Sequence, residues 1–391
     1  MDIYERSLAL HREHKGKIEI RSRMRLETTD DLSLAYTPGV ARPCEAIAAD
    51  PSAAWDLTWR GRTVAVVTDG SAVLGLGDIG AAASLPVMEG KAALFSRFAG
   101  VDAIPIALDV HEPDDFVAAV RALAPTFGGI NLEDISAPRC FEIEERLQDI
   151  GIPVLHDDQH GTAIVLLAGL LNAAKVVGRP MDSLSVVING AGAAGRAIAF
   201  LLSHESEAPY SAPVKQIRIC DSRGMIYPGR PGNGAIKEEI GRVTNPEAEE
   251  GDIHSAIRGA DVFIGVSKAN LLSADDIRQM APDSIVFPMA NPVPEIMPDE
   301  AFAGGAAVVG TGRSDFPNQV NNVLAFPGLF RGALQARATR FTPAMKRAAV
   351  DAIAGAVARP TPEEILPSPF DLSVPPAVAA AVEAAWKAEK A

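Results

Sequence analysis

The chain has 391 residues, enough for two or three domains, and 48% of them are hydrophobic while 22% are charged. This composition is typical of a globular protein with a sizeable core, and it excludes a disordered chain. The net charge of −14 argues against nucleic acid as a partner, because binding it requires lysine and arginine to neutralise phosphates. Bound divalent cations remain compatible with such a charge.

The cysteines and the apolar segments indicate the cellular compartment of the protein. The three cysteines, Cys44, Cys140 and Cys220, are far apart and form no CxxC pair, which predicts reduced thiols rather than a disulfide framework or a zinc site. The first twenty residues carry charges throughout and lack the apolar centre of a signal peptide. The longest apolar stretch, 162–174, is too short to span a membrane. We therefore expect a cytoplasmic protein without membrane contact.

The first third of the chain has the pattern of an α/β domain. Short apolar runs at 63–68 and 103–108 predict buried strands, and the composition of 86–98 predicts a helix between them. A third short strand is expected at 153–155, followed by a polar run at 156–160. We place a domain boundary after this run, which gives an N-terminal catalytic domain of residues 1–160.

The remaining chain, residues 161–391, predicts a dinucleotide-binding domain followed by C-terminal helices. A long apolar helix is expected from 162 to 177, and strands then alternate with helices, which predicts a doubly wound parallel sheet. Two helices separated by a proline-rich segment, 360–376, are expected after residue 341. The strands are expected at 184–189, 216–221, 261–266, 284–288 and 307–310.

The pattern G-x-G-x-x-G, typical of dinucleotide-binding turns, occurs twice, at Gly75-Gly77-Gly80 and at Gly190-Gly192-Gly195. The second match directly follows a predicted strand and directly precedes a helix, as the function requires. The first is separated from its strand by six residues, 69–74, Asp78 would face the phosphates, and Pro86 should break the helix after it. We therefore predict that the second match binds the dinucleotide and that the first forms tight structural turns.

Within the second match, the glycines with Ala193 and Ala194 would let the backbone approach the pyrophosphate at a helix N-terminus. Asp221 ends the next predicted strand and is placed to accept a hydrogen bond from the adenosine ribose. This acid favours NAD because it would repel a 2′-phosphate, but the nearby Arg223 could accommodate that group. NAD is therefore predicted, with NADP left open.

Acidic residues occur as two pairs, Glu133-Asp134 and Asp157-Asp158. Adjacent residues can share a ligand only at a strand end or a turn, and the context after residue 128 fits that condition. Carboxylates that converge on one point require a cation, and an all-oxygen set selects Mg²⁺ or Mn²⁺. His156 and His160 would suggest zinc, but no cysteine or further histidine has the matching spacing. The alternative is that both pairs are solvated or helix-capping acids.

Eight segments resemble the malic enzymes, particularly the short bacterial form. They follow the family's order between residues 34 and 334: LAYTPGVA (34–41), VVTDGSAVLGLGDIG (66–80), PVMEGKAALF (86–95), NLEDISAPRCFEIE (131–144), HDDQHGTA (156–163), INGAGAAGRA (188–197), ANPVPEI (290–296) and NQVNNVLAFPGLFRGAL (318–334). The resemblance implies oxidative decarboxylation of L-malate to pyruvate and CO₂ with NAD or NADP and Mg²⁺ or Mn²⁺. It also implies a homodimer or a dimer-based homo-oligomer.

Carried over position by position, the resemblance implies roles for individual residues. Lys91 is implied as the general base that takes the C2 hydroxyl proton, which requires a lowered pKa from burial and a nearby metal. Tyr36 is implied as the acid that protonates the enolate, and Asp157 as the residue that orients Lys91. The implied metal ligands are Glu133, Asp134 and Asp158, and the implied amides for substrate and nicotinamide are Asn291, Asn321 and Asn322.

Two departures from the family's pattern matter. Larger members carry an arginine for a substrate carboxylate where this chain has Ser71 and Ala72, so Ser71 or backbone donors at Gly70–Ser71 are candidates for that task. The chain also ends at Ala391 without the acetyltransferase-like extension of some bacterial members. We expect no acyl-CoA regulation through such a domain.

Three other functions stay open at this stage. The chain could be a non-decarboxylating two-domain 2-hydroxy-acid or amino-acid dehydrogenase, which needs no cation. It could be an oxaloacetate decarboxylase that uses the nucleotide site only structurally. It could also be a catalytically inactive regulatory relative, although such a protein would be free to lose Tyr36, Lys91 or one of the carboxylates.

Overall fold

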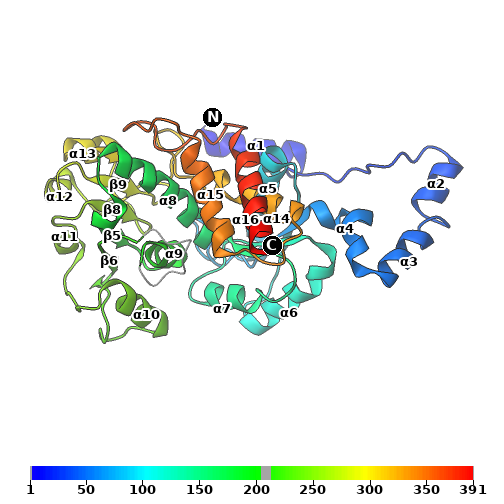
Figure 1. The fold of residues 1–391 in the computed structure, drawn as a ribbon, viewed down its shortest axis with the longest axis horizontal. Helices are drawn as coiled ribbons and strands as arrows, with labels where there is room; N and C mark the ends of the chain where they lie inside the picture. Colours follow the sequence, from blue (N-terminus) through cyan, green and yellow to red (C-terminus); the bar gives the residue numbers. More distant parts are fainter. Residues whose placement is uncertain (1, 204–212, 391) are drawn as a thin grey trace.

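A computed structural model of the chain describes residues 2–203 and 213–390. Figure 1 shows two α/β bodies side by side, with a helical arm that projects from the N-terminal one. Each body is built around its own sheet, which confirms the predicted fold class of two α/β regions with a doubly wound parallel sheet in the second.

The first sheet has four parallel strands in the order β2-β1-β3-β4. The strand predicted at 63–68 is confirmed without change, and the next two predicted strands are each shifted by one residue. The elements of this region are β1 (Thr63–Thr68), α5 (Ala81–Ala99), β2 (Asp102–Ala107), α6 (Pro113–Leu123), β3 (Gly129–Leu132), α7 (Arg139–Arg146) and β4 (Val154–His156).

The second sheet has the order β10-β9-β8-β5-β6-β7, and all of its pairings are parallel except that of β6 with β7. The direction of winding reverses between β5 and β8, which is where doubly wound sheets bind their ligands. Its strands are β5 (Ser185–Asn189), β6 (Gln216–Asp221), β7 (Gly224–Met225), β8 (Val262–Gly265), β9 (Ile285–Pro288) and β10 (Val308–Val309). Its connecting helices are α9 (Ala193–Leu202), α10 (Ala235–Thr244), α11 (Ile253–Ala256), α12 (Ala274–Arg278) and α13 (Pro298–Ala303).

Two helix predictions were wrong. Helix α8 (Asp157–Val176) begins five residues earlier than predicted, because the polar run after β4 forms its first turn. Acids are favourable there, since a helix N-terminus presents unpaired N–H groups and a positive dipole end. Pro86 does not break its helix either, as α5 runs through it. The missing N–H costs one hydrogen bond, whereas burial of Met88, Ala92 and Phe95 anchors that helix to the sheet.

The C-terminal helices join the two bodies. Helix α14 (Phe326–Gln335) was not predicted, while α15 (Pro343–Gly355) and α16 (Val374–Lys390) confirm the two helices expected after residue 341. Phe95 of α5 stacks edge-on against Phe326 and Phe330 of α14, with ring centroids 4.7 and 5.4 Å apart. These contacts bury aromatic surface between elements of the two regions, so the bodies share one core.

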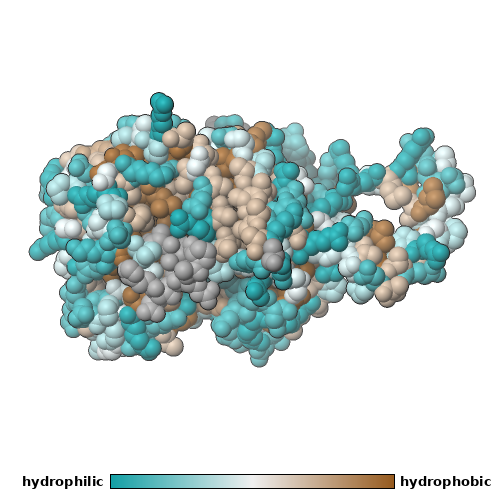
Figure 2. Space-filling view, in the orientation of Figure 1, coloured by the Kyte–Doolittle hydropathy of each residue, from teal (hydrophilic) through white to brown (hydrophobic). Residues whose placement is uncertain are grey.

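The N-terminal arm contrasts with this core. Figure 1 shows α1 (Ile3–His14) over the main body, and the arm itself contains α2 (Thr29–Ala35), α3 (Ala41–Ala49) and, at its base, α4 (Ala54–Leu57). Helices α1, α2 and α3 bury no side chain. Helices α2 and α3 project away from both sheets (Figure 1). Figure 2 shows apolar side chains on this arm, where Leu32 and Leu34 are 55% and 64% exposed. Within residues 2–203 and 213–390, no helix is long and apolar enough to cross a membrane.

Candidate active site

Lys91 lies at the contact between the two bodies. Helix α5 presents it on its buried face, and its Nζ donates a hydrogen bond of 2.6 Å to Oδ2 of Asp157, the first residue of α8. The same Nζ lies 2.9 Å from Oε1 of Glu133 and 4.2 Å from the ring centroid of Phe326. The side chain is only 7% exposed, so it is an ion-paired buried amine and not a solvated helix lysine.

The pKa of Lys91 depends on burial and on two neighbouring carboxylates. Burial alone would lower it, but the charges and hydrogen bonds of Asp157 and Glu133 together raise the pKa above its ordinary value. Asp157 and Glu133 both stabilise the ammonium form of Lys91. The lowered pKa implied for the metal-bound site stays a prediction.

The three predicted metal ligands come together. Carboxylate oxygens of Glu133, Asp134 and Asp158 all lie within 4.8 Å of one another. As the sequence predicted, the adjacent pair converges because the strand ends: β3 stops at Leu132, and Asp134 takes a left-handed conformation with φ of 54°. That turn directs two neighbouring side chains toward the same point.

The carboxylates of this cluster are oriented by the protein, and some of their oxygens stay unpaired. Oδ2 of Asp158 accepts a 2.8 Å hydrogen bond from the backbone N–H of Asp134. Oδ2 of Asp134 is buried and has no hydrogen-bond partner among the described residues. Burial, followed by the charge of Asp158, raises the pKa of Asp134 to about 7. A buried, unpaired carboxylate oxygen beside two further carboxylates fits a hard divalent cation.

Sequence reasoning missed a neighbour of this cluster. Asn131, fully buried on β3, donates a 2.8 Å hydrogen bond through Nδ2 to Oε2 of Glu133. The signal was available, because residues two apart on a strand point to the same face, and a buried asparagine needs a partner.

The predicted dinucleotide turn lies at the reversal point of the second sheet. Gly190 follows β5 with φ of 120°, and a Cβ there would approach the carbonyl oxygen of Val266, after β8, to 2.6 Å. A Cβ on Gly195 would overlap the carbonyl oxygen of Gly190. Gly192 immediately precedes α9, so the first N–H groups of that helix open onto the turn. Strand, turn and helix are therefore packed so closely that Gly190 and Gly195 have no room for a side chain.

The first G-x-G-x-x-G match has a different structure. Gly80 caps the N-terminus of α5, so this match also stands between a strand and a helix. However, Gly77 and Gly80 have open space where a Cβ would lie, and only their positive φ values require glycine. They serve turns, as predicted, without the close packing of the second match.

Asp221 ends β6 as predicted, but its carboxylate is held by cations. Arg230 Nη2 lies 2.6 Å and Lys237 Nζ lies 2.7 Å from Oδ2, and the backbone N–H of Arg223 donates to Oδ1 at 2.8 Å. Burial opposes ionisation, yet the hydrogen bonds from Arg230 and Lys237 bring the pKa of Asp221 well below its ordinary value.

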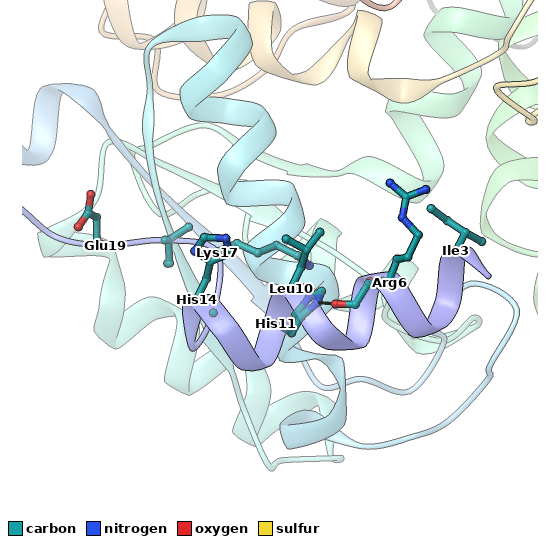
Figure 3. A pocket seen from close by; sticks show the side chains of 10 residues that line it. Ile3, Arg6, Leu10, His11, His14, Lys17 and Glu19 are labelled. Atoms are coloured by element: carbon teal, nitrogen blue, oxygen red, sulfur yellow. Dashed lines mark hydrogen bonds between the residues drawn. The ribbon is translucent and has the colours of Figure 1, made fainter. Parts of the chain in front are cut away.

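A cavity of about 630 Å³ lies between two carboxylates of the cluster, Asp134 and Asp158, and the glycine turn at 192–194. Asn291 reaches it from the loop after β9, and Asn321 from the segment before α14. Asn322 also lines it, but its Nδ2 donates to Asp157 Oδ2. The lining includes the predicted site residues Asp134, Asp158, Gly192, Ala193, Ala194, Asn291, Asn321 and Asn322. A groove of about 790 Å³ along α1 is larger, but it is lined only by residues 3–19 and holds none of these groups (Figure 3).

The lining does not include several other residues that the sequence predicted or offered for the site: Tyr36, Ser71, Lys91, Glu133, Asp157, Gly190, Gly195 and Asp221. Tyr36 ends α2 on the projecting arm and is 67% exposed. Ser71 lies near the cluster, but its hydroxyl donates a 2.6 Å hydrogen bond to Asp69 and accepts one of 2.9 Å from the N–H of Ser136. It therefore has no free donor for a substrate carboxylate.

Comparison with known proteins agrees with this geometry. The model of the malic enzyme N-terminal domain matches residues 15–113 and 111–148, and the model of the malic enzyme NAD-binding domain matches residues 159–385. The chain belongs to the malic enzyme family. It is 56% identical over 386 residues to a bifunctional malic/malolactic enzyme of Bacillus subtilis, covering 98% of this chain and 92% of that protein.

Two further relatives extend the comparison. An NAD-dependent malic enzyme of Geobacillus stearothermophilus is 51% identical, covering 99% of this chain and 80% of that protein. The crystal structure of the NAD-dependent malic enzyme of Thermotoga maritima superimposes with a TM-score of 0.91 at 46% identity, covering 98% of this chain and 99% of the other. The fold and the order of elements are therefore those of the family.

Proposed function

We propose that this protein oxidises and decarboxylates L-malate to pyruvate and CO₂ with reduction of NAD or NADP. The observation that carries the proposal is that two carboxylates of the cluster, Asp134 and Asp158, line one cavity together with residues 192–194 of the glycine turn. The Lys91–Asp157 pair adjoins the cluster through Glu133. A simple dehydrogenase would need no such cluster, because hydride transfer alone does not require a cation.

In this proposal Glu133, Asp134 and Asp158 hold Mg²⁺ or Mn²⁺, and the turn from Gly190 to Gly195 holds the pyrophosphate of the dinucleotide. When bound, the cation supplies Lewis acidity for the loss of CO₂, and the dinucleotide accepts the hydride. The unpaired Oδ2 of Asp134 and the free N–H groups at the start of α9 support these two assignments.

Lys91 is proposed to take the proton of the C2 hydroxyl at its Nζ. Asp157 orients that atom through the 2.6 Å hydrogen bond, and the ring of Phe326 limits its movement on another side. Lys91 can act as a base only in its neutral form, and Asp157 and Glu133 oppose that form by raising its pKa. A cation bound to the carboxylates would offset their charge and favour the neutral amine. The amides of Asn291 and Asn321 are proposed to hold the substrate carboxylates and the nicotinamide, since the hydroxyl of Ser71 is already used.

Tyr36 is proposed to protonate the enolate from a second copy of the chain, as part of a homodimer. Its exposure and its place on the arm support this, because α2 lies away from α5 and α8 in the single chain (Figure 1). The exposed leucines of α2 supply apolar surface that a second copy would cover.

Cofactor choice depends on the surroundings of Asp221. The carboxylate favours NAD, but Arg230 and Lys237 neutralise it and Arg223 follows it on the chain. NAD is therefore the proposed cofactor, and the cations leave room for NADP.

Two proposals concern the whole chain. We divide it into residues 1–160 and 161–391, and α8 begins in the first part and continues through the second, so it fixes Asp157 and Asp158 relative to the glycine turn. We also propose a cytoplasmic location, which the unpaired cysteines among the described residues support.

The test of the reaction is nicotinamide reduction with L-malate and Mn²⁺, run with NAD and with NADP, with pyruvate measured at the end. We expect reduction and pyruvate in equal amounts, both abolished by a chelator. Reduction that persists in the chelator without pyruvate would instead indicate a non-decarboxylating dehydrogenase.

Subunit mixing tests the origin of the tyrosine. Tyr36→Phe and Lys91→Ala should each be inactive alone, whereas hybrids formed by mixing them should recover about a quarter to a half of the activity, since one site per hybrid is intact. Hybrids without activity would place both residues in one subunit.

A further inference from the structure

Glu144 is a buried carboxylate outside the cluster described above. It lies on α7, is 8% exposed, and accepts three hydrogen bonds. The backbone N–H of His156 donates to its Oε1 at 2.9 Å, and Nε2 of Gln159 donates to its Oε2 at 2.8 Å. Nε2 of His160 lies 3.1 Å from the same Oε2. None of these four residues has a role in the proposed reaction.

The position of the proton on His160 follows from its two neighbours. Nε2 lies 3.1 and 3.0 Å from the two oxygens of Glu144, and a carboxylate only accepts, so the proton is on Nε2 and donates to Glu144. Nζ of Lys346, on α15, lies 3.1 Å from Nδ1 and 3.4 Å from Nε2, so the nearer Nδ1 is the acceptor for that ammonium. Lys346 thus connects the C-terminal helices to this network.

The amide of Gln159 fixes His156 in the same way. Its two N–H groups reach two acceptors, Oε2 of Glu144 at 2.8 Å and Nδ1 of His156 at 3.1 Å. The proton of His156 is therefore on Nε2, which lies 3.2 Å from Oδ2 of Asp158. That contact is close but poorly directed for a hydrogen bond, so its effect is electrostatic.

The network ends on a proposed metal ligand. Oδ2 of Asp158 accepts a hydrogen bond from the backbone N–H of Asp134 and lies 3.2 Å from Nε2 of His156, so two groups hold this carboxylate in place. The contacts thus run from Glu144 through Gln159 and His156 to Asp158.

We propose that Glu144 is a positioning residue that, through Gln159 and His156, holds Asp158 in the orientation that binds the divalent cation. The inference rests on the metal site proposed above. Its physical basis is that groups behind a ligand fix the ligand's orientation, and loss of such a group typically weakens metal binding about 10- to 100-fold. Glu144 suits this task because it accepts from three donors that come from β4 and α8 at once.

The test is a titration with Mn²⁺ in the absence of malate and dinucleotide. The electron paramagnetic resonance signal of free Mn²⁺ measures how much of the ion is bound. In Glu144→Gln, an NH₂ donor replaces one acceptor oxygen and meets the donors of His156, Gln159 or His160. We expect the dissociation constant for Mn²⁺ to rise at least tenfold. The matched control is Glu142→Gln on the same helix, whose carboxylate pairs with Arg146 at the surface, 2.8 Å away, and it should bind Mn²⁺ like the unsubstituted protein.

A second variant keeps the test decisive if Glu144→Gln does not fold. Gln159→Met removes the link between Glu144 and His156 and should also weaken Mn²⁺ binding about tenfold. A general loss of stability would lower the melting temperature without changing the affinity of the folded protein. Mn²⁺ affinity unchanged in the folded variants would overturn the positioning role alone. Absence of Mn²⁺ binding to the unsubstituted protein would overturn the metal site itself, and the positioning role with it.

Discussion

Two acidic regions occupy equivalent places in the two sheets, and their environments are opposite. Glu133 follows the carboxyl end of β3, and Asp221 ends β6. Glu133 belongs to a cluster of three carboxylates and shares Lys91 with Asp157, and burial raises the pKa of Glu133 well above its ordinary value. Asp221 instead has two cations within 2.7 Å and a lowered pKa.

The difference shows which of the two regions needs a positively charged ligand. The cluster after β3 carries more negative charge than its single lysine can balance, so a bound cation would stabilise it. The negative charge of Asp221 is already compensated by Arg230 and Lys237, so the carboxylate presents little net charge to a bound dinucleotide. An acidic residue at a strand end therefore does not identify the ligand by itself. Its neighbours decide whether the site favours a cation or is already neutral.

Removal of the cluster's only ammonium should have the largest effect. We expect Lys91→Ala to lower kcat about a thousandfold, because it removes the proposed base, while Mn²⁺ binding is retained because a competing positive charge is lost. Steady-state rates with malate and Mn²⁺ measure the first effect, and an Mn²⁺ titration measures the second. Lys387→Ala, at a surface pair with Glu383, is the control and should be unchanged. Near-normal kcat in Lys91→Ala would remove Lys91 from the mechanism.

Removal of one carboxylate from the cluster should come next. Asp158→Asn should weaken Mn²⁺ binding about a hundredfold, because a neutral amide replaces a charged ligand. At Mn²⁺ one hundred times above its dissociation constant, the unsubstituted protein should gain about 2.7 kcal/mol of stability, and the variant little. Thermal unfolding with and without Mn²⁺ measures this. Asp275→Asn, on the exposed side of α12, should behave like the unsubstituted protein, and an equal gain in Asp158→Asn would contradict the ligand assignment.

The same change at the other region should alter cofactor choice and not metal binding. In Asp221→Asn, Arg230 and Lys237 lose their carboxylate partner and can face a 2′-phosphate. We expect the ratio of kcat/KM with NADP to that with NAD to rise about tenfold, equivalent to ~1.4 kcal/mol. Mn²⁺ affinity serves as the internal control. A ratio that stays constant or falls would show that Asp221 does not discriminate between the two.

The pH dependence of stability should have opposite signs in the two regions. The folded pKa of Asp134, about 7, is above its ordinary value of 3.8, so the metal-free protein should lose stability as pH rises from about 4 to about 7. For Asp221 the folded pKa is lowered, so its contribution is present above about 4 and lost as pH falls further.

Urea unfolding at several pH values without metal measures both slopes. In the unsubstituted protein, the free energy of unfolding should fall by up to about 1.4 kcal/mol per pH unit between pH 4 and 7. Asp134→Asn should not show this decrease. Asp221→Asn should change stability only by an amount that is constant above pH 5. If the free energy of unfolding depends on pH in the same way in the unsubstituted protein and in Asp134→Asn, the pKa of Asp134 is not raised in the folded protein.

Much of the fold could be predicted because its signals are local. The strand at 63–68, the strand at 216–221 and the glycine turn were each given by a short run of residue types with a known backbone requirement. The convergence of Glu133 with Asp134 also followed from sequence, since it needs only a strand end. Errors arose where packing overrides local preference, as at Pro86 inside α5 and in the first turn of α8.

The sequence by itself determined the family, the two-sheet plan and the residue types that the proposed chemistry needs. Only the tertiary structure decided which charges meet: Lys91 contacts Asp157 across 66 positions, and Lys346 contacts His160 across 186. It also decided that Asp221 is neutralised by Arg230 and Lys237 and that Tyr36 stands apart on the arm. The physical reason is that backbone conformation depends on neighbours along the chain, whereas burial and charge pairing depend on residues that folding brings together from distant positions.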